Sequence, residues 1–314
     1  MTTSARSILA VALASALVAA CSNSAAAPQT PASASNSAPP VSPSTQGAGT
    51  GLPHFAHVYL LVLENEEYAS LVGSADAPYL NGLIAKYGLA SNYYGVAHPS
   101  QPNYLALFSG STQGVTDDGN HDLTGTNLAD QLDAAHKTWS VFAQDYPGGC
   151  FAGATKGGAG EGIGAAGSYA RKHNPAISFT AISSNPSRCA RIANFAAFDP
   201  AAADFELIAP NQCNDMHSCP IATGDAFLST FVPRITSSPA FADSVLFITT
   251  DEGKSDSGGG GQVVTVVISP LGKTGFTSAM RHDHYSLLHT IENSWGLSCL
   301  AQSCSANDMA EFFK

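Results

Sequence analysis

The 314-residue sequence is long enough for one large domain or two small ones. Apolar residues make up 44% of it, which allows a substantial core, whereas charged residues make up only 12% and the formal net charge is -11. This balance excludes a nucleic-acid binder that works through bulk positive charge. It does not exclude an anionic substrate, because a bound metal ion can reverse the local sign of the charge.

Residues 1–20 have the pattern of a targeting signal. Arg6 precedes an apolar run at 8–18 that is too short to span a membrane as a mature helix. The run ends in VAAC at 18–21, which resembles the lipobox of bacterial lipoproteins. We therefore expect a lipoprotein signal peptide, a lipidated Cys21, and a protein that is exported and either lipid-anchored on the outer side of the bacterial membrane or secreted. The alternative is an ordinary secretion signal that ends near a cysteine.

The next segment is low in complexity. Residues 22–52 are rich in Ala, Ser, Pro, Thr, Gln and Gly and contain no charged residue. Such a segment cannot bury enough apolar surface to fold alone. We expect residues 21–52 to be the lipidated cysteine and a disordered tether, followed by one folded domain over 53–314.

The cysteines indicate disulfide bonds. Seven are present, and six remain if Cys21 is lipidated, an even number typical of disulfide bonding in an exported protein. Short loops favour Cys213–Cys219 and Cys299–Cys304, which leaves Cys150–Cys189. Six cysteines allow fifteen connectivities, so the pairing is a hypothesis. Zinc ligation is a weaker alternative, because no pair has CxxC spacing.

Strands and helices alternate along the domain. In chain order we predict a strand at 57–63, helices at 76–88, from 103–108 and at 126–137, strands at 139–143 and 205–208, a helix at 224–235, strands at 244–249 and 263–268, and a helix at 284–295. The apolar run HVYLLVL at 57–63 is typical of a strand buried on both faces of a parallel sheet. Thr126 is a candidate N-cap of its helix. The alternation predicts an α/β fold, a three-layer sandwich around a mostly parallel sheet.

Polar residues follow several of these strands. Glu64 and Asn65 come directly after the first strand, and Asp251 and Glu252 follow the strand at 244–249. In open α/β sheets, ligands bind outside the carboxyl ends of the strands. A single acidic residue there is more often a helix cap or a solvated turn. Two pairs of oxygen donors after two buried strands favour a site for a hard divalent cation.

Ser100 lies in the segment HPSQPNY at 98–104, just before a helix that we expect to begin near Pro102. Backbone N–H groups and the helix dipole favour an anion at such a position. The plainer interpretation is that Ser100 only caps the helix. A neighbouring metal ion would change this, because coordination lowers the pKa of a hydroxyl and creates a nucleophile.

Several motifs together resemble one family. HPSQPNYLALFSG is similar to the nucleophile motif of the bacterial phosphoesterase family, which groups acid phosphatases and phospholipases C within the alkaline phosphatase superfamily. The segments LVLEN, PNQCNDMH, GDAFL, TDEG and HDHYSLLHTIE match in the family's order. With YARKHNP, the shared stretches most resemble secreted acid phosphatases that act on phosphatidylinositol 3-phosphate. The resemblance implies an alkaline-phosphatase-like fold from about His54 to the C-terminus.

The resemblance also implies roles for individual residues. The metal ligands match Glu64, Asn65, Asp251 and Glu252, and the nucleophile matches Ser100. Asn103 matches the residue that holds a phosphoryl oxygen. The active-site histidines match His173, His217 and His284, and the substrate-binding group is completed by His98, Lys172 and Asp215.

One metal ion is expected, because the acidic residue and histidine of Asp215-Met216-His217 are closer together than in two-metal relatives. Its identity is open among Ca, Mg, Mn, Zn and Fe. The expected partners are a phosphorylated small molecule or a phosphoinositide, and the membrane through the lipid anchor. We expect a monomer that binds no nucleic acid.

The leading functional prediction is a metal-dependent phosphomonoesterase, an acid phosphatase with a serine nucleophile. A phospholipase C-like phosphodiesterase is the second enzyme hypothesis. A solute-binding or adhesion lipoprotein of the cell surface is the alternative without catalysis, since anchor and tether fit it equally well.

Overall fold

The computed structural model describes residues 51–156 and 168–314. The expected signal peptide, the lipidation site Cys21 and the tether as far as residue 50 lie outside the described residues. In the part of the chain that is described, no helix is both long enough and apolar enough to cross a membrane.

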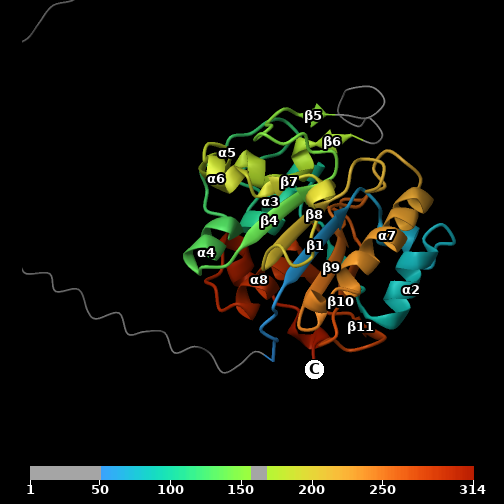
Figure 1. Ribbon diagram of the computed structural model, residues 1–314. Coiled ribbons are helices and arrows are strands. Elements are labelled where there is room, and N and C mark those ends of the chain that lie inside the picture. The colour runs from blue at the N-terminus through green and yellow to red at the C-terminus, as the bar shows by residue number, and fades with distance from the viewer. Residues whose placement is uncertain (1–50, 157–167) are drawn as a thin grey trace, which may run out of the picture. The chain divides into compact units, whose positions relative to one another are not determined.

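The domain is built on an eight-stranded sheet in the order β11-β2-β10-β9-β1-β8-β4-β7 (Figure 1). Strand β1 pairs in parallel with β8 and β9, and β4 pairs in parallel with β8 and β7. Strand β10 runs antiparallel to both of its neighbours, β9 and β2. The prediction of a mostly parallel sheet is therefore confirmed. The strands are β1 Val58–Leu63, β2 Gly88–Ala90, β4 Trp139–Ala143, β7 Ile192–Ala193, β8 Phe205–Ala209, β9 Val245–Thr250, β10 Thr265–Ile268 and β11 Phe276–Ser278.

Helices cover both faces of the sheet, which gives the predicted three layers (Figure 1). Alternate side chains of β1 point to opposite faces, as in any strand. Val58, Leu60 and Val62 belong to the core that also contains apolar residues of α3, α4 and α8. Tyr59 and Leu61 belong to the core shared with α2 and α7. These helices are α2 Pro78–Lys86, α3 Ser100–Ser109, α4 Leu128–Ala134, α7 Ile221–Thr236 and α8 His284–Ser294.

Short elements connect these layers. The short helices are α1 Tyr68–Leu71, α5 Thr180–Ser183 and α6 Pro186–Cys189, and the 3-10 helices are η1 Arg171–His173, η2 Pro175–Ser178, η3 Phe195–Ala197, η4 Pro239–Phe241, η5 Ser257–Gly259, η6 Ala301–Ser305 and η7 Ala310–Phe312. Two small ribbons pair β3 Tyr93–Tyr94 with β12 His282–Asp283, and β5 Thr155–Lys156 with β6 Tyr169–Ala170.

The helix starts differ from two predictions. Helix α4 is capped by Asn127, whose side chain accepts from the Asp130 backbone N–H, so Thr126 is not the cap. The Asp130 carboxylate accepts from the Asn127 N–H and completes a capping box. Thr126 could not form such a box, because the residue three positions after it is Ala129. Helix α3 begins at Ser100 itself, with Pro99 in the cap position and without any side-chain cap. Ser100 is therefore the first residue of the helix and not its cap.

The described chain reaches the sheet at its amino edge. The Ser294 hydroxyl donates to the Pro53 carbonyl and accepts from the Phe55 N–H, and the Trp295 indole donates to the Phe55 carbonyl. These contacts fix the chain against the end of α8 just before β1 begins. The carboxyl end of β1 lies at the opposite edge.

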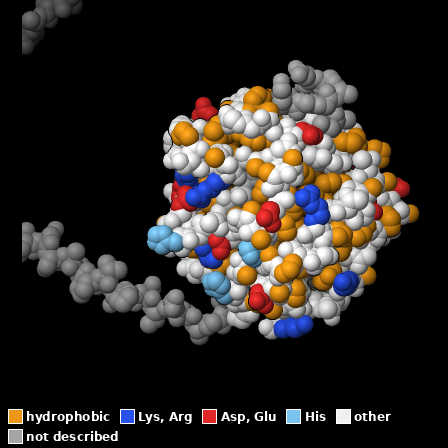
Figure 2. Space-filling view, in the orientation of Figure 1, with side chains coloured by type: hydrophobic (Ala, Val, Ile, Leu, Met, Phe, Trp, Pro, Cys, Tyr) orange, Lys and Arg blue, Asp and Glu red, His pale blue; other side chains and the backbone are white. Residues whose placement is uncertain are grey.

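All three predicted disulfides are present: Cys150–Cys189, Cys213–Cys219 and Cys299–Cys304. The first links the strand β4 side of the sheet to α6, and the other two close short loops. On the face drawn in Figure 2, charged side chains are scattered among neutral and apolar ones. Met280 is an exposed large apolar side chain, with 47% of its surface accessible.

Glu206 is a buried carboxyl in the middle of the sheet, on β8. Its Oε1 accepts from the Ala203 N–H over 3.3 Å, and its Oε2 has no hydrogen-bond partner. Burial, together with the nearby charge of Asp199, raises the pKa of Glu206 to about 8. The folded protein thus keeps a proton that the unfolded chain releases above its ordinary pKa of about 4.3.

We predict that Glu206 makes the folded protein less stable as pH rises from about 4.5 to about 8, because over this range the unfolded state gains a charge that the folded state resists. The side chain in Glu206→Gln stays neutral at every pH. The free energy of unfolding of this variant minus that of the wild type should therefore be about 2–4 kcal/mol larger at pH 8 than at pH 5. Urea denaturation at several pH values measures this, with the exposed Asp76→Asn as control. Parallel curves for wild type and Glu206→Gln would contradict it.

Candidate active site

Ser100 stands in a group of oxygen atoms at the carboxyl edge of the sheet. Its buried hydroxyl lies 3.0 Å from Glu64 Oε2, 3.2 Å from Glu252 Oε1 and 3.4 Å from Asn65 Oδ1. A hydroxyl has one hydrogen and can donate to only one of these acceptors. The group therefore holds more oxygen lone pairs than protons, which is the donor set that a cation requires.

The register of the two central strands brings this group together. Leu63, the last residue of β1, pairs with Thr250, the last residue of β9, so the residues that follow both strands are neighbours. The Asp251 N–H donates to the Leu63 carbonyl over 3.0 Å, and the Asn65 N–H donates to Asp251 Oδ1 over 3.1 Å. Asn65 has a left-handed backbone with a φ of 46°, a conformation that Asn tolerates better than most residues.

The carboxylates of this group repel one another. Burial, and then the charges of Glu64 and Glu252, raise the pKa of Asp251 well above its usual range. Burial and Glu64 also raise the pKa of Glu252, although His98 works in the opposite direction. Burial would raise the pKa of Glu64 too, but the adjacent positive His173 overrides it and lowers the pKa to about 2.

Asp251 gives the clearest sign that a cation fits here. Its Oδ2 is buried and has no hydrogen-bond partner. Buried charges in proteins are normally paired or bound to metal ions. Across residues 51–156 and 168–314, however, no three side chains of His, Cys, Asp or Glu form a group that could hold a metal ion. A cation at this edge would thus depend on the Asn65 and Ser100 oxygens as well as on the carboxylates.

Lys172 brings a positive charge next to the Ser100 hydroxyl. Its Nζ lies 3.2 Å from Ser100 Oγ, 2.9 Å from Asp118 Oδ2 and 3.5 Å from His217 Nε2. Burial alone would lower the pKa of Lys172, but the charges of Glu64 and Asp118 raise it. The ammonium group is thus held in its charged form beside the hydroxyl.

His173 bridges two acidic residues. Its Nε2 lies 3.2 Å from Glu64 Oε1 and its Nδ1 lies 3.3 Å from Asp215 Oδ2. The ring stacks on Tyr104, with 5.2 Å between ring centroids, and the Tyr104 hydroxyl donates to Glu64 Oε1 over 2.5 Å. Burial opposes protonation, yet Glu64 and Asp215 raise the pKa of His173 to about 9. His173 therefore balances the charge of Glu64.

His217 follows Asp215 and faces the same site. Asp215 Oδ1 accepts from the His217 backbone N–H over 2.8 Å, and His217 Nδ1 lies 3.0 Å from the Ser218 hydroxyl. Burial lowers the pKa of the imidazole. With Nε2 near Lys172, this histidine has a ring nitrogen on the Ser100 side of the site.

His98 and His284 contact the acidic group from outside. His98 Nδ1 pairs with Glu252 Oε2, and its Nε2 lies 3.0 Å from the Ser255 carbonyl. His284 is buried, with Nδ1 3.1 Å from the Tyr93 hydroxyl and Nε2 against the Asp251 carbonyl. Burial lowers the pKa of His284 to about 4, so it is neutral. Both of its nitrogens are engaged with Tyr93 and the Asp251 backbone, which suits it to position Asp251.

Asn103 is also engaged elsewhere. Its Oδ1 accepts from the Val96 and Ala97 N–H groups over 2.8 and 3.2 Å, and its Nδ2 donates to the Ala97 and Pro99 carbonyls over 2.8 and 3.4 Å. The amide thereby fixes the loop that precedes Ser100. In this structure every donor and acceptor of the amide binds this loop. The expected contact of Asn103 with a phosphoryl oxygen stays a prediction.

The glycine run at 258–261 supports the same loop from outside. The Gly260 N–H donates to the Gly95 carbonyl over 3.1 Å. A Cβ atom on Gly260 would come within 2.6 Å of the Ala97 carbonyl oxygen. Glycine is thus required at this position by the close approach of the two backbones.

Tyr104 and Asp118 are site residues that the sequence reasoning did not predict. Tyr104 is the last residue of HPSQPNY, and this position was the one feature of the sequence that could have indicated a place in the site. Asp118 lies in the loop after α3, and nothing in its sequence neighbourhood points to Lys172.

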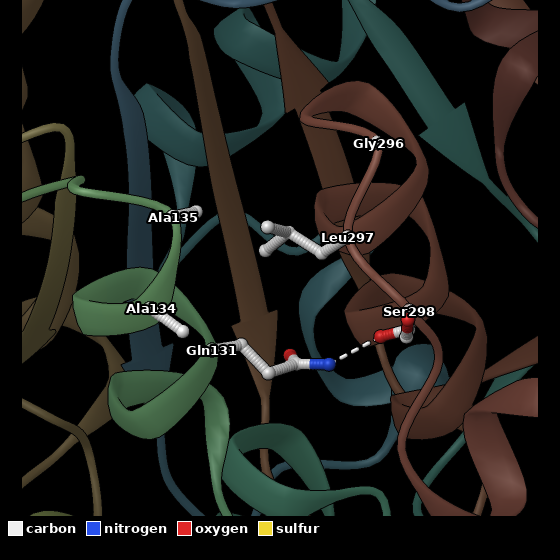
Figure 3. A pocket seen from close by; sticks show the side chains of 6 residues that line it. All are labelled: Gln131, Ala134, Ala135, Gly296, Leu297 and Ser298. Atoms are coloured by element: carbon white, nitrogen blue, oxygen red, sulfur yellow. Dashed lines mark hydrogen bonds between the residues drawn. The ribbon is translucent and has the colours of Figure 1, made fainter.

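Two cavities lie apart from this site. One of about 300 Å³ lies between α4 and the segment after α8, lined by Gln131, Ala134, Ala135, Gly296, Leu297 and Ser298. Figure 3 shows its Gln131 amide pointing at the Ser298 carbonyl. The second, of about 350 Å³, lies between α2 and the end of α7. Neither is lined by a residue of the oxygen group.

Comparison with known proteins agrees with this architecture. The Phosphoesterase family model matches residues 65–298. The phosphatidylinositol-3-phosphatase of Mycobacterium tuberculosis is 34% identical over 257 residues, which cover 80% of this chain and 80% of the relative. An acid phosphatase of Aspergillus fumigatus is 28% identical over 288 residues, which cover 88% of this chain but only 62% of the fungal protein.

Solved structures show the fold. A protein in the alkaline phosphatase superfamily from Vibrio parahaemolyticus has a TM-score of 0.53 at 10% identity, with 81% of this chain and 70% of the other covered. The lipoteichoic acid synthase LtaP of Listeria monocytogenes also gives 0.53 at 10% identity, covering 83% and 78%. The fold is thus alkaline-phosphatase-like, as expected. Because the family model spans well over half of the sequence, the chain belongs to the Phosphoesterase family and is a hydrolase of phosphoric esters.

Proposed function

We propose that this protein is a metal-dependent phosphomonoesterase, an acid phosphatase in which Ser100 is the nucleophile and Glu64, Asn65, Asp251 and Glu252 hold one divalent cation. The observation that carries the proposal is the position of the Ser100 hydroxyl, between an excess of acidic oxygens and the ammonium of Lys172. When bound, the cation would lower the pKa of the hydroxyl and offset the negative charge of the carboxylates and the phosphate.

The neighbouring residues have defined tasks in this proposal. Ser100 Oγ loses its proton to solvent and attacks phosphorus, and Lys172 binds a phosphoryl oxygen. The ester P–O bond breaks, and His217 gives the leaving alkoxide a proton. Water then gives a proton to His217 and attacks the phosphoserine, the Oγ–P bond breaks, the Ser100 oxygen is released to its starting state, and inorganic phosphate leaves. Since burial lowers the pKa of His217, its protonated form requires acidic solution, which favours acid phosphatase activity.

The substrate and the location are part of the proposal. The name of the mycobacterial relative makes phosphatidylinositol 3-phosphate the first phosphoinositide to test. Three disulfides favour an oxidising compartment outside the cytosol. The lipid anchor at Cys21, attachment to the membrane and the monomeric state stay predictions.

Replacing Ser100 by Ala tests the nucleophile. We expect kcat for p-nitrophenyl phosphate to fall at least about 1,000-fold, because the covalent step loses its attacking atom. Ser109→Ala is the matched control, since Ser109 lies in the same buried helix but its hydroxyl donates to the Leu105 carbonyl. Near-normal turnover by a folded Ser100→Ala variant would reject the proposal.

Removal of divalent ions tests the metal site. Chelation should abolish phosphate release, and one divalent ion should restore it, with about one ion per active chain by mass spectrometry. Asp251→Asn should lose the bound ion and also raise the thermal midpoint of the chelated protein, because it removes one of several repelling carboxylates. Asp243→Asn, just before the opposite end of β9, should change neither. Full metal content in Asp251→Asn would contradict the ligand set.

The role of Asn103 is tested by stability as well as by rate. Asn103→Ala should lower the free energy of unfolding by about 1–3 kcal/mol, since it leaves loop backbone groups without partners. The exposed Asn307→Ala should leave stability unchanged. If Asn103→Ala slows hydrolysis with no loss of stability, the amide acts on the phosphate rather than on the loop.

A further inference from the structure

Asp118 uses both of its carboxylate oxygens on neighbours of the nucleophile. Its Oδ2 accepts from Lys172 Nζ over 2.9 Å, and its Oδ1 accepts from the Gln101 N–H over 3.0 Å. Gln101 directly follows Ser100 at the start of α3. The Asp118 side chain therefore contacts both the backbone next to Ser100 and the Lys172 ammonium that lies beside the Ser100 hydroxyl.

The contact with Gln101 replaces a missing helix cap. The first N–H groups of a helix have no partner within it and are usually satisfied by the side chain of the N-cap residue. Here the N-cap is Pro99, which has no side-chain oxygen. Asp118 supplies that oxygen from the loop that follows α3, so the position of the first turn of the helix depends on this loop.

The contact with Lys172 fixes a long side chain. A lysine side chain has a flexible four-carbon stem, and its ammonium is a compact charge without the fixed geometry of a guanidinium. The Lys172 side chain is nevertheless buried, and its ammonium has the Asp118 carboxylate on one side and Ser100 Oγ on the other. Arg171 secures the same loop, because its Nη2 donates to the His121 carbonyl over 2.8 Å.

We propose that Asp118 is a positioning residue for phosphoryl transfer, which holds the Lys172 ammonium against Ser100 Oγ and fixes the first turn of α3. This inference rests on the proposed function, in which Ser100 attacks and Lys172 binds the phosphate. The Asp118 side chain forms hydrogen bonds with Lys172 and Gln101, and no hydrogen bond or ion pair joins it to Ser100 Oγ or to the proposed cation ligands, so it acts through Lys172 and Gln101.

The neighbouring Asp117 provides a matched control. It is exposed, and its Oδ1 accepts from the Gly119 N–H and pairs with His121, both over 2.7 Å. Asp118→Asn keeps an oxygen for the Gln101 N–H but presents an amide donor to Lys172. Asp117→Asn changes the same charge by the same amount in the same loop.

We predict that Asp118→Asn lowers kcat/KM for p-nitrophenyl phosphate about 10- to 100-fold and weakens inhibition by inorganic phosphate about as much, because the phosphate-binding ammonium is released. Asp117→Asn should retain the wild-type values. Lys172→Met should be at least as impaired as Asp118→Asn, and the double variant should be no worse than Lys172→Met, since Asp118 acts through the lysine. Asp118→Glu should recover part of the loss.

The inference is overturned if Asp118→Asn matches the wild type, if the double variant shows the product of the two losses, or if Asp118→Asn and Asp117→Asn are equally impaired. If Asp118→Asn does not fold, the phosphate inhibition constant of Asp118→Glu is measured instead. A wild-type inhibition constant in Asp118→Glu, together with a wild-type kcat in Lys172→Met, then overturns the proposal. Ser100→Ala separates the two levels. An active Ser100→Ala variant refutes the proposed function, whereas an inactive one beside an unimpaired Asp118→Asn refutes only the positioning role.

Discussion

The site depends on a concentration of negative charge that the sheet enforces. The pairing of Leu63 with Thr250 ends two parallel strands at the same level, so the carboxyl groups of Glu64 and Asp251 are buried next to each other. Repulsion between like charges is stronger in a protein interior than in water. A sequence with this arrangement must supply compensating positive charge, and much of the surrounding structure does so.

The compensation comes from several directions. His173 lies against Glu64, and Lys172 lies beside the Ser100 hydroxyl. His284 and Asn103 contribute no charge. They bind backbone groups and thereby fix Asp251 and the loop before Ser100. Strain and repulsion of this kind are retained at functional sites at some cost in stability.

The sequence predicted the layers of the fold and most of the residues that lie together around Ser100, and physical reasons explain both what it predicted and what it missed. Fully apolar runs such as 58–63 identify buried parallel strands, and residues after such strands meet at one edge. The three disulfides followed from short loops and a remainder of two cysteines. Asp118 could not be predicted, because its partner Lys172 is distant in sequence and the pair is set by loop conformation. Asn103 was placed on the phosphate by its motif, although its amide contacts are backbone groups that a motif does not reveal.

The direction of β1 has a practical consequence. The described chain reaches this strand at the amino edge, beside Ser294 and Trp295, while Ser100 lies at the other edge, about 20 Å away for a strand of this length. A bead, a fused domain or an affinity handle joined directly to residue 51 would therefore be attached on the side remote from Ser100. Immobilisation at residue 51 would leave the edge that carries Ser100 open to bulky molecules presented from solution or from a facing surface.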